Sequence, residues 1–312
     1  MTHRVTSWSI SDSVELSFAS PILVGVLNVT PDSFSDGGRY QDPSAAVRQG
    51  HALIEAGASM LDVGGESTRP GAASVSEGEQ IARTQSVINE LRAATDVPIS
   101  IDTTRAAVAE AALDAGADVI NDVSGGLDDP ALLPLAARRR CGVVLMHRRC
   151  RPADDAWSDA YASEPIYADV TLDVRDTLLA LADRAIAVGV DAARIAIDPG
   201  LGFGKSVGQN WELVARMRTL VNAGYPVLAG ASRKSFIGAV TGQTEPSERV
   251  VASVATACWL AGCGVQMLRV HDVAETAVAI RSARGILHAG RACIESILEA
   301  PSCPATMSPP VQ

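Results

Sequence analysis

The chain is 312 residues long, 47% of them hydrophobic and 20% charged, with a formal net charge of −10 and a sequence pI near 5.0. Its length allows one large domain or two smaller ones. Because no block of Lys and Arg offsets the acidic balance, the composition argues against nucleic acid or an anionic membrane as a partner.

The cysteines and the chain ends indicate a protein of a reducing compartment. None of the six cysteines forms a C-x-x-C pair, and no Cys/His cluster has zinc-site spacing, so we expect free thiols and a cytoplasmic location. Residues 1–20 form a polar N-terminal extension without the apolar segment of a signal peptide. Residues 299–312, rich in Pro and Ser, are predicted to be a disordered tail. The longest apolar runs are short and broken by Gly, so no membrane span is expected.

Short apolar runs recur along the chain, and each one ends in polar residues. The first, residues 21–26 (PILVGV), opens into residues 27–38 (LNVTPDSFSDGG). The next runs lie in residues 59–71, 97–105, 117–126, 141–149, 193–206, 225–235 and 264–272. Between them lie amphipathic or Ala-rich segments, most of them long enough for a helix and several with Gly near the end.

Eight strands that alternate with helices predict a parallel sheet. Eight is also the number that closes a (β/α)₈ barrel, here a single domain over residues 21–298. An open doubly wound sheet is the alternative, but no G-x-G-x-x-G follows the first strand. The segment DPGLGFGKS approaches a phosphate-binding P-loop, yet Pro199 stands where that motif requires Gly.

In a barrel of this kind the loops at the carboxyl ends of the strands build the active site. One mouth would then receive the strand-end residues Asn28, Asp62, Asp102, Asn121, Asp198 and His271. A single such residue is more often a turn former or a cap, whereas six around one mouth indicate a functional site. Arg269 shares a strand face with His271, two residues later.

The residue types at this mouth favour a flat heterocycle and an anion. Carboxylates accept from ring N–H and amino groups, while amides both donate and accept. The basic residues Arg69, Lys234 and Arg269, with His271, could hold a phosphate or a carboxylate. The segment GASRKSFIG would open a helix whose free N–H groups bind an anion, although a solvated helix start explains Arg233 and Lys234 equally well. No Ser/His/Asp or Cys/His arrangement is evident.

Seven motifs together resemble those of the dihydropteroate synthases. They are NVTPDSFSDGG, DVGGESTRPGA, SIDTTR, INDVSGG, DPGLGFGKS, GASRKSFIG and RVHDV, in the order of that family and one at each expected strand end. The resemblance extends over residues 21–298. It implies a transferase of folate biosynthesis that joins 6-hydroxymethyl-7,8-dihydropterin diphosphate to 4-aminobenzoate and releases diphosphate. It also implies Mg²⁺ bound with the diphosphate and competition by sulfonamides at the aminobenzoate site.

The resemblance also implies roles for individual residues, which divide into three groups. The pterin would be bound by Asp102, Asn121, Asp198 and Lys234, with Met146 and Gly230 as pocket walls. The diphosphate would be held by Asn28, Arg269 and His271, with Asn28 also the protein ligand of Mg²⁺. The aminobenzoate pocket would be formed by Phe34, Thr68, Arg69, Pro70 and Phe203, with Ser235 at its carboxylate. Five of these are expected to act in catalysis: Asn28, Asp102, Lys234, Arg269 and His271.

The loops after the first two strands are expected to be mobile lids. Both are long, polar and Gly-rich, and in the family such closure would complete the aminobenzoate pocket only after the pterin substrate is bound. Ordered binding with the pterin first is the consequence. The apolar segment 247–264, with small residues spaced along it, is expected to form a homodimer interface, although packing on the barrel explains it equally well.

Two departures from the commonest family pattern leave the polar strand ends intact. Arg148, Arg149 and Cys150 bring extra charge to the loop after the fifth strand, either near the pterin mouth or outside it, and Arg105 with Ala106 replaces a frequent Lys-Pro. Two alternatives stay open at this stage. A methyltetrahydrofolate:corrinoid methyltransferase would share the strand-end Asp and Asn residues but has no need of the SRKS and RVH segments. A catalytically silent pterin-binding paralogue would be expected to lack a diphosphate or metal residue.

Overall fold

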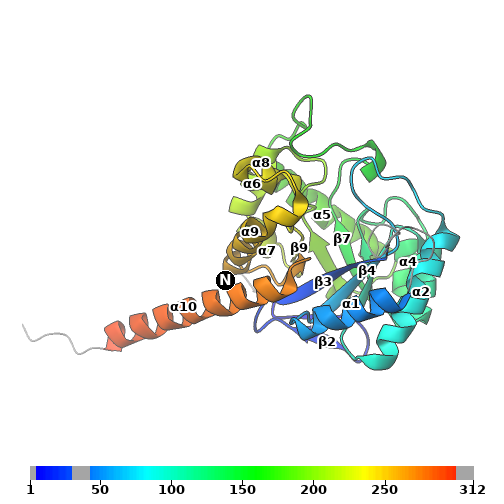
Figure 1. Ribbon diagram of the computed structural model, residues 1–312, viewed down its shortest axis with the longest axis horizontal. Coiled ribbons are helices and arrows are strands. Elements are labelled where there is room, and N and C mark those ends of the chain that lie inside the picture. The colour runs from blue at the N-terminus through cyan, green and yellow to red at the C-terminus, as the bar shows by residue number, and fades with distance from the viewer. Residues whose placement is uncertain (1–4, 30–42, 300–312) are drawn as a thin grey trace, which may run out of the picture.

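Eight of the strands form one parallel sheet that curls into a barrel (Figure 1). The computed structural model describes residues 5–29 and 43–299, with side chains up to residue 286. The barrel strands are β3 (Ile22–Asn28), β4 (Met60–Gly64), β5 (Ile99–Asp102), β6 (Val119–Asp122), β7 (Gly142–Met146), β8 (Ile195–Asp198), β9 (Leu228–Ala229) and β10 (Met267–Val270). They are joined in the order β8-β7-β6-β5-β4-β3-β10-β9, and a parallel bridge between Ile197 and Val227 closes the ring. The predicted (β/α)₈ barrel is confirmed.

Helices cover the outside of the barrel and alternate with its strands. They are α1 (Pro43–Glu55), α2 (Glu77–Ala94), α3 (Ala106–Asp114), α4 (Leu132–Arg139), α5 (Val170–Ala187), α6 (Val207–Ala215), α7 (Arg218–Val221), α8 (Ser235–Thr241), α9 (Val250–Cys263) and α10 (Val273–Glu299). Short 3₁₀ helices span Pro152–Asp154, Ala192–Arg194 and Pro246–Arg249. The last helix, α10, runs outward from the barrel (Figure 1), and the predicted tail beyond it lies outside the described residues.

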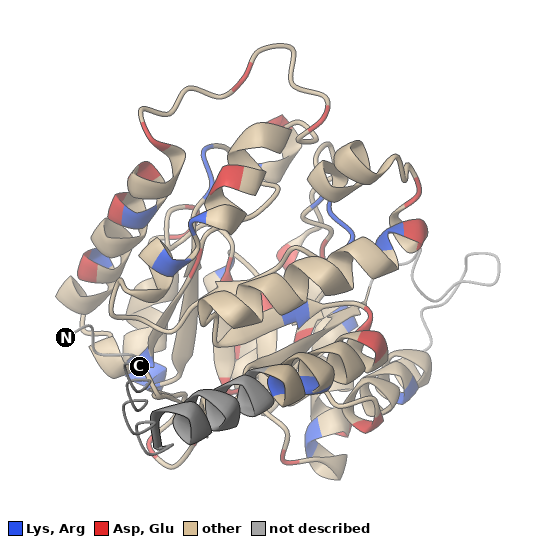
Figure 2. Ribbon diagram, turned by 90° about the vertical axis from the view of Figure 1, so that its left-hand side faces the viewer, with Lys and Arg blue, Asp and Glu red and all other residues tan. Residues whose placement is uncertain are grey.

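The strands are apolar on both faces because each face meets a different apolar layer. In β3, for example, Leu23 and Leu27 pack outward against the helices, while Ile22 and Val24 point into the barrel. The outer surface carries charges of both signs, with Lys and Arg interspersed with Asp and Glu along the helices in the view of Figure 2. Some of these charges form ion pairs, for example Arg139 with Asp114 at 2.6 Å.

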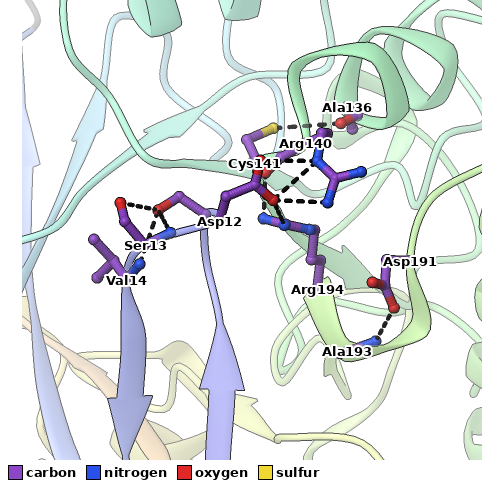
Figure 3. Close-up of polar contacts among 10 residues, drawn as sticks. Asp12, Ser13, Val14, Ala136, Arg140, Cys141, Asp191, Ala193 and Arg194 are labelled. Atoms are coloured by element: carbon purple, nitrogen blue, oxygen red, sulfur yellow. Dashed lines mark hydrogen bonds and ion pairs between the residues drawn. The ribbon is translucent and has the colours of Figure 1, made fainter.

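The N-terminal extension closes the amino end of the barrel. Its described part forms a hairpin of β1 (Ser7–Ser9) and β2 (Glu15–Ser17), whose buried Trp8 joins the interior layer. The carbonyl oxygen of Ile10 accepts a hydrogen bond from the Gly142 N–H of β7 at 2.9 Å. At the turn, Asp12 forms ion pairs with Arg140 and Arg194 (Figure 3). The extension therefore seals the end of the barrel opposite to the predicted active site.

Candidate active site

The inward-facing side chains change from apolar to polar along the barrel axis. The inner apolar layer contains Met60, Val119, Val144, Ala196 and Met267. Two positions further along the same strands stand Asp62, Asn121, Met146, Asp198 and Arg269. Because alternate residues of a strand point to the same face, the second set lies directly above the first, at the carboxyl ends of the strands.

A pocket at this end gathers most of the residues predicted to bind the substrates. All six predicted pterin residues line it: Asp102, Asn121, Met146, Asp198, Gly230 and Lys234. Arg269, Phe203 and Thr68 line it as well. These side chains come from positions between residues 68 and 269, so only the closure of the barrel brings them together.

A buried ion-pair network holds the wall of the pocket. The guanidinium of Arg269 donates from Nε to Asp62 at 2.6 Å and from a terminal nitrogen to Asp102 at 3.0 Å. Asp62, which is fully buried, also accepts from Asn121 at 3.1 Å and from the Ser100 hydroxyl at 2.5 Å. Both oxygens of Asp62 therefore accept hydrogen bonds, and one of the donors is the cationic Arg269. Asp62 thereby orients two pocket residues, Asn121 and Arg269.

Asp102 is poised for an incoming ligand. Its Oδ2 accepts a hydrogen bond from Arg269, while its buried Oδ1 has no hydrogen-bond partner among the described residues. Burial raises the pKa of Asp102 to about 7, the nearby charge of Asp62 adds to this rise, and Arg269 opposes it. An unpaired buried acceptor is costly, so a ligand N–H at this oxygen would bind favourably.

Asp198 and Lys234 face the same pocket, and burial shifts the pKa of each side chain. Burial raises the pKa of Asp198 to about 6, opposed by the hydrogen bond from the Gly200 N–H at 2.7 Å. Burial lowers the pKa of Lys234 to about 8, the charge of Arg269 adds to the fall, and the two carboxylates Asp198 and Asp102 oppose it. The Lys234 ammonium lies 4.1 Å from the centre of the Phe203 ring, a cation–π contact that fixes its position.

Asn28 and His271, the other predicted diphosphate residues, lie beside the pocket and not in its lining. Asn28 and Asp102 lie on either side of Gly64, because a Cβ at Gly64 would make ordinary contacts with Asn28 Oδ1 at 3.7 Å and with Asp102 Cβ at 3.6 Å. His271 bonds the Ser232 hydroxyl through its own N–H at 3.2 Å and through Nδ1 at 3.0 Å. Burial lowers the pKa of His271 to about 3, and the cationic Arg269 adds to this, so its imidazole is neutral.

The predicted aminobenzoate residues are less closely gathered. Thr68 and Phe203 line the pocket, while Arg69 is exposed and Pro70 half-buried in the same loop as Thr68. Ser235 begins α8 outside the lining, and its hydroxyl accepts a hydrogen bond from the Ser158 N–H at 3.2 Å. Phe34 lies outside the described residues, as does nearly all of the first predicted lid.

The two arginines of the loop after β7 contact partners outside the pocket lining. Arg148 forms a 2.6 Å ion pair with Asp128, and the guanidinium of Arg149 lies 4.8 Å from the centre of the Tyr167 ring. None of Arg148, Arg149 and Cys150 is among the residues that line the pocket. Their charges serve the packing of the loop.

One site residue, Asp62, was expected at the mouth but was given no role from the sequence. A clear signal was present, because Asp62 follows the interior Met60 by two residues, as Asn121 follows Val119. The strand pattern alone does not reveal that its partner is Arg269, 207 residues later in the chain.

The described residues contain no group of three or more His, Cys, Asp or Glu side chains arranged to hold a metal ion. Within the same part of the chain, no helix has both the length and the apolar character needed to cross a membrane. The described cysteines Cys141, Cys150, Cys258 and Cys263 are free thiols.

Known proteins share both the sequence and the fold of this chain. The profile of the family described as pterin binding enzyme matches residues 24–271. The dihydropteroate synthase of Mycobacterium leprae is 45% identical over 280 residues, which are 88% of this chain and 96% of that protein.

Two solved structures extend the comparison. Xanthomonas albilineans dihydropteroate synthase with 4-aminobenzoic acid superposes with a TM-score of 0.82 at 42% identity, covering 90% of this chain and 98% of that one. Yersinia pestis dihydropteroate synthase in a sulfonamide drug complex gives a TM-score of 0.82 at 37% identity, covering 90% and 99%. The chain therefore belongs to the dihydropteroate synthase family of pterin binding enzymes.

Proposed function

We propose that this chain condenses 6-hydroxymethyl-7,8-dihydropterin diphosphate with 4-aminobenzoate, giving 7,8-dihydropteroate and diphosphate. The observation that carries the proposal is the single pocket in which Asp102, Asn121, Asp198, Lys234 and Arg269 meet. Such a set of two carboxylates, an amide and two cations offers the acceptors and donors that a pterin ring requires.

The pterin would lie against the polar layer of the barrel. The free Oδ1 of Asp102 and the carboxylate of Asp198 would accept from ring N–H and amino groups, and Asn121 would bond both ways. Lys234 would donate to a ring acceptor. Met146 and Gly230 would form the walls, and Gly230 lies beside Arg269, whose Cβ is 3.6 Å from where a Gly230 Cβ would stand.

The diphosphate would be bound at the side of the pocket where β3 and β10 pair. Arg269 would supply a cation, and the neutral His271, fixed through Nδ1 by Ser232, would present its other ring nitrogen. Mg²⁺ fits this side because Asn28 offers an amide oxygen beside Asp102, and Mg²⁺ commonly takes one or two protein oxygens, substrate phosphates and water. When bound, the metal would neutralise charge on the departing diphosphate.

The reaction needs binding and electrostatics more than a covalent nucleophile. The bond between the pterin methylene carbon and the diphosphate oxygen breaks, and its electron pair leaves with diphosphate. The pterin ring delocalises the resulting positive charge, which the nearby carboxylate of Asp102 stabilises. The aminobenzoate nitrogen then forms the new C–N bond and loses a proton. Holding the amine close to the methylene supplies the remaining rate advantage.

The aminobenzoate would bind where Thr68 and Phe203 line the pocket, with Arg69 and Pro70 of the same loop. The roles of Phe34 and Ser235 stay predictions of the family resemblance. Sulfonamides would compete at this place. If closure of the loops on the pterin substrate completes the pocket, aminobenzoate binds second. Tight binding of aminobenzoate to the enzyme without pterin or diphosphate, measured by calorimetry, would contradict that order.

We also propose a homodimer that acts in the cytoplasm. Helix α9 presents exposed apolar side chains, with Val251 78% and Trp259 56% exposed, and such a surface favours association. Light scattering of the wild type should give twice the monomer mass, and Val251→Glu should halve it. A monomeric wild type would contradict this proposal. The free thiols of the described cysteines support the reducing compartment.

The test of the activity is diphosphate release by the purified chain. Release should require the pterin diphosphate, aminobenzoate and Mg²⁺ together, and dihydropteroate should appear in equal amount. Lys234→Ala and Asp102→Ala should each lose at least about a hundredfold in kcat. Arg218→Ala, which removes an exposed cation of α7, serves as the control and should keep wild-type activity. Retained activity in both pocket variants would refute the site assignment.

A further inference from the structure

Lys205 is a fully buried cation that the reaction as described does not use. It ends the loop after β8, and its ammonium has three hydrogen-bond partners. These are the carbonyl oxygens of Gly200 and Phe203, both at 2.9 Å, and Nδ1 of His147 at 3.0 Å. Three N–H groups thus meet three acceptors, two within the loop and one at the end of β7.

Three other side chains also hold this loop, because they accept hydrogen bonds from its backbone N–H groups. Asp198 accepts from Gly200 at 2.7 Å, Asn210 from Gly202 at 2.7 Å, and Asp155 from Gly204 at 2.8 Å. With these N–H groups held outward, the carbonyls of Gly200 and Phe203 turn toward Lys205. Buried carbonyls need donors. Lys205 donates to both, and the Gly200 carbonyl also accepts from the Phe203 N–H at 3.1 Å.

The loop conformation leaves little freedom for adjustment. Gly200, Gly202 and Gly204 have φ values of +64°, +81° and +59°, which other residues rarely adopt. A Cβ on Gly200 would collide with the carbonyl oxygen of His147, and one on Gly202 would lie 2.9 Å from Lys234 Cδ. The backbone therefore packs directly on the end of β7 and on the side chain of Lys234.

The loop after β8 supports the side chain of Lys234 in the pocket. The Phe203 ring lies 4.1 Å from the Lys234 ammonium, and both residues line the pocket. Lys205 holds the carbonyl of this same Phe203. A shift of the loop would move the ring and release the ammonium that it fixes.

The charges around Lys205 agree with this arrangement. His147, which is buried, has a pKa lowered to about 2 by burial and by the Lys205 charge, so it accepts as a neutral imidazole. Burial lowers the pKa of Lys205 itself to about 7, while the carboxylates Asp198 and Asp155 favour its charged form. Such a buried cation costs stability, which an apolar residue in a purely packing role would avoid.

We propose that Lys205 is a positioning residue of the pterin pocket: it fixes the loop after β8 so that Phe203 holds Lys234 in place. The inference rests on the proposed function, because it assigns Lys205 to the binding of the pterin. Lys205 does not line the pocket and would act through the loop. Replacing Lys205 should therefore weaken pterin binding more than any other step of the reaction.

The test compares Lys205→Met with a matched control, Arg194→Met. Arg194 is also a buried cation bonded to a backbone carbonyl, but it lies at the amino end of the barrel (Figure 3). Both variants should lower the thermal midpoint. Lys205→Met alone should lose about 10- to 100-fold in kcat/KM for the pterin diphosphate and about tenfold in affinity for 6-hydroxymethylpterin by fluorescence titration.

A double variant distinguishes positioning through the loop from general destabilisation. If Lys205 acts through Phe203, then Lys205→Met with Phe203→Leu should lose little more than the more impaired single variant, whereas independent effects would multiply. If Lys205→Met does not fold, Lys205→Gln, whose shorter amide reaches fewer of the three acceptors, should still fall at least threefold below the wild type.

The outcomes separate the two proposals. A wild type that neither binds the pterin nor turns over its diphosphate refutes the proposed function. The inference about Lys205 is overturned if the wild type is active and Lys205→Met stays within threefold of the wild type in kcat/KM and in pterin affinity. If Lys205→Met does not fold, the same criterion applies to Lys205→Gln. The proposed function stands in either case. Equal losses in Arg194→Met overturn the inference in the same way.

Discussion

Replacing Asp62 by Asn should move the acid limb of the pH profile toward lower pH. Asp62 shares the guanidinium of Arg269 with Asp102, and its charge is the second cause, after burial, that raises the Asp102 pKa to about 7. An Asn at this position can keep its oxygen toward Arg269 and Asn121 and turn its NH₂ toward Ser100. The substitution therefore removes a charge and preserves the shape.

The size of the shift follows from the geometry of the shared guanidinium. Bonds of 2.6 and 3.0 Å to one Arg269 place the two carboxylates roughly 5 Å apart, which at an effective dielectric constant of about 20 gives about 3 kcal/mol of repulsion. That is about two pKa units. Without the charge of Asp62, Arg269 would also interact more strongly with Asp102, which lowers the pKa of Asp102 further. Because the pKa of Asp198, about 6, then sets the limb, the observable shift is about one unit.

The assay is kcat/KM for the pterin diphosphate between pH 5 and 9, since this ratio reports the ionisation of the free enzyme. Ionisation of the substrate is common to all variants and cancels between them. Ser100→Ala is the control, because it removes a hydrogen bond to Asp62 and leaves the charge. A limb in Asp62→Asn that stays in place or moves to higher pH would refute the electrostatic account, as would an equal shift in Ser100→Ala.

Three further variants test other parts of the structure. Lys234, with its pKa lowered to about 8, should set the basic limb of the same profile, so Lys234→Arg should extend activity to higher pH, and an unmoved limb would exclude that role. Asn28→Ala should raise the Mg²⁺ concentration for half-maximal activity about tenfold or more in a metal titration, and an unchanged requirement would remove Asn28 as the ligand. Trp8→Ala should lower the free energy of unfolding by about 3–5 kcal/mol in urea with kcat unchanged, and a large loss of kcat would show that the hairpin acts on the far end of the barrel.

The sequence was informative about the site because strand geometry repeats every two residues. Each polar residue predicted at the mouth ends an apolar run, and parallel strands end together, so Asp102, Asn121 and Asp198 had to meet. The same rule places Arg269 and His271 on one face. Eight-fold closure was predictable from the count of runs.

What the sequence could not supply are contacts between residues far apart in the chain. The bond from Arg269 to Asp62 depends on how the side chains of two barrel strands meet in the interior. The ion pairs from Asp12 to Arg140 and Arg194, and the contact of Ser235 with Ser158, depend on how loops and the N-terminal hairpin pack. None has a local periodicity. The hairpin strands β1 and β2 were too short, at three residues each, to be distinguished within the polar extension.

The charges of the pocket explain why the free enzyme is suited to a cationic intermediate. Three carboxylates, Asp62, Asp102 and Asp198, oppose two cations, Lys234 and Arg269, and Asp62 is committed to Arg269. Burial is the main cause of the raised pKa of Asp102, and the negative charge of Asp62 adds to it. Positive charge that develops on the pterin as diphosphate leaves would relieve this surplus of negative charge more than the neutral ring does. Only interactions that are stronger in the transition state than in the ground state accelerate a reaction, so the proposed mechanism predicts that the repulsion between Asp62 and Asp102 would contribute to catalysis.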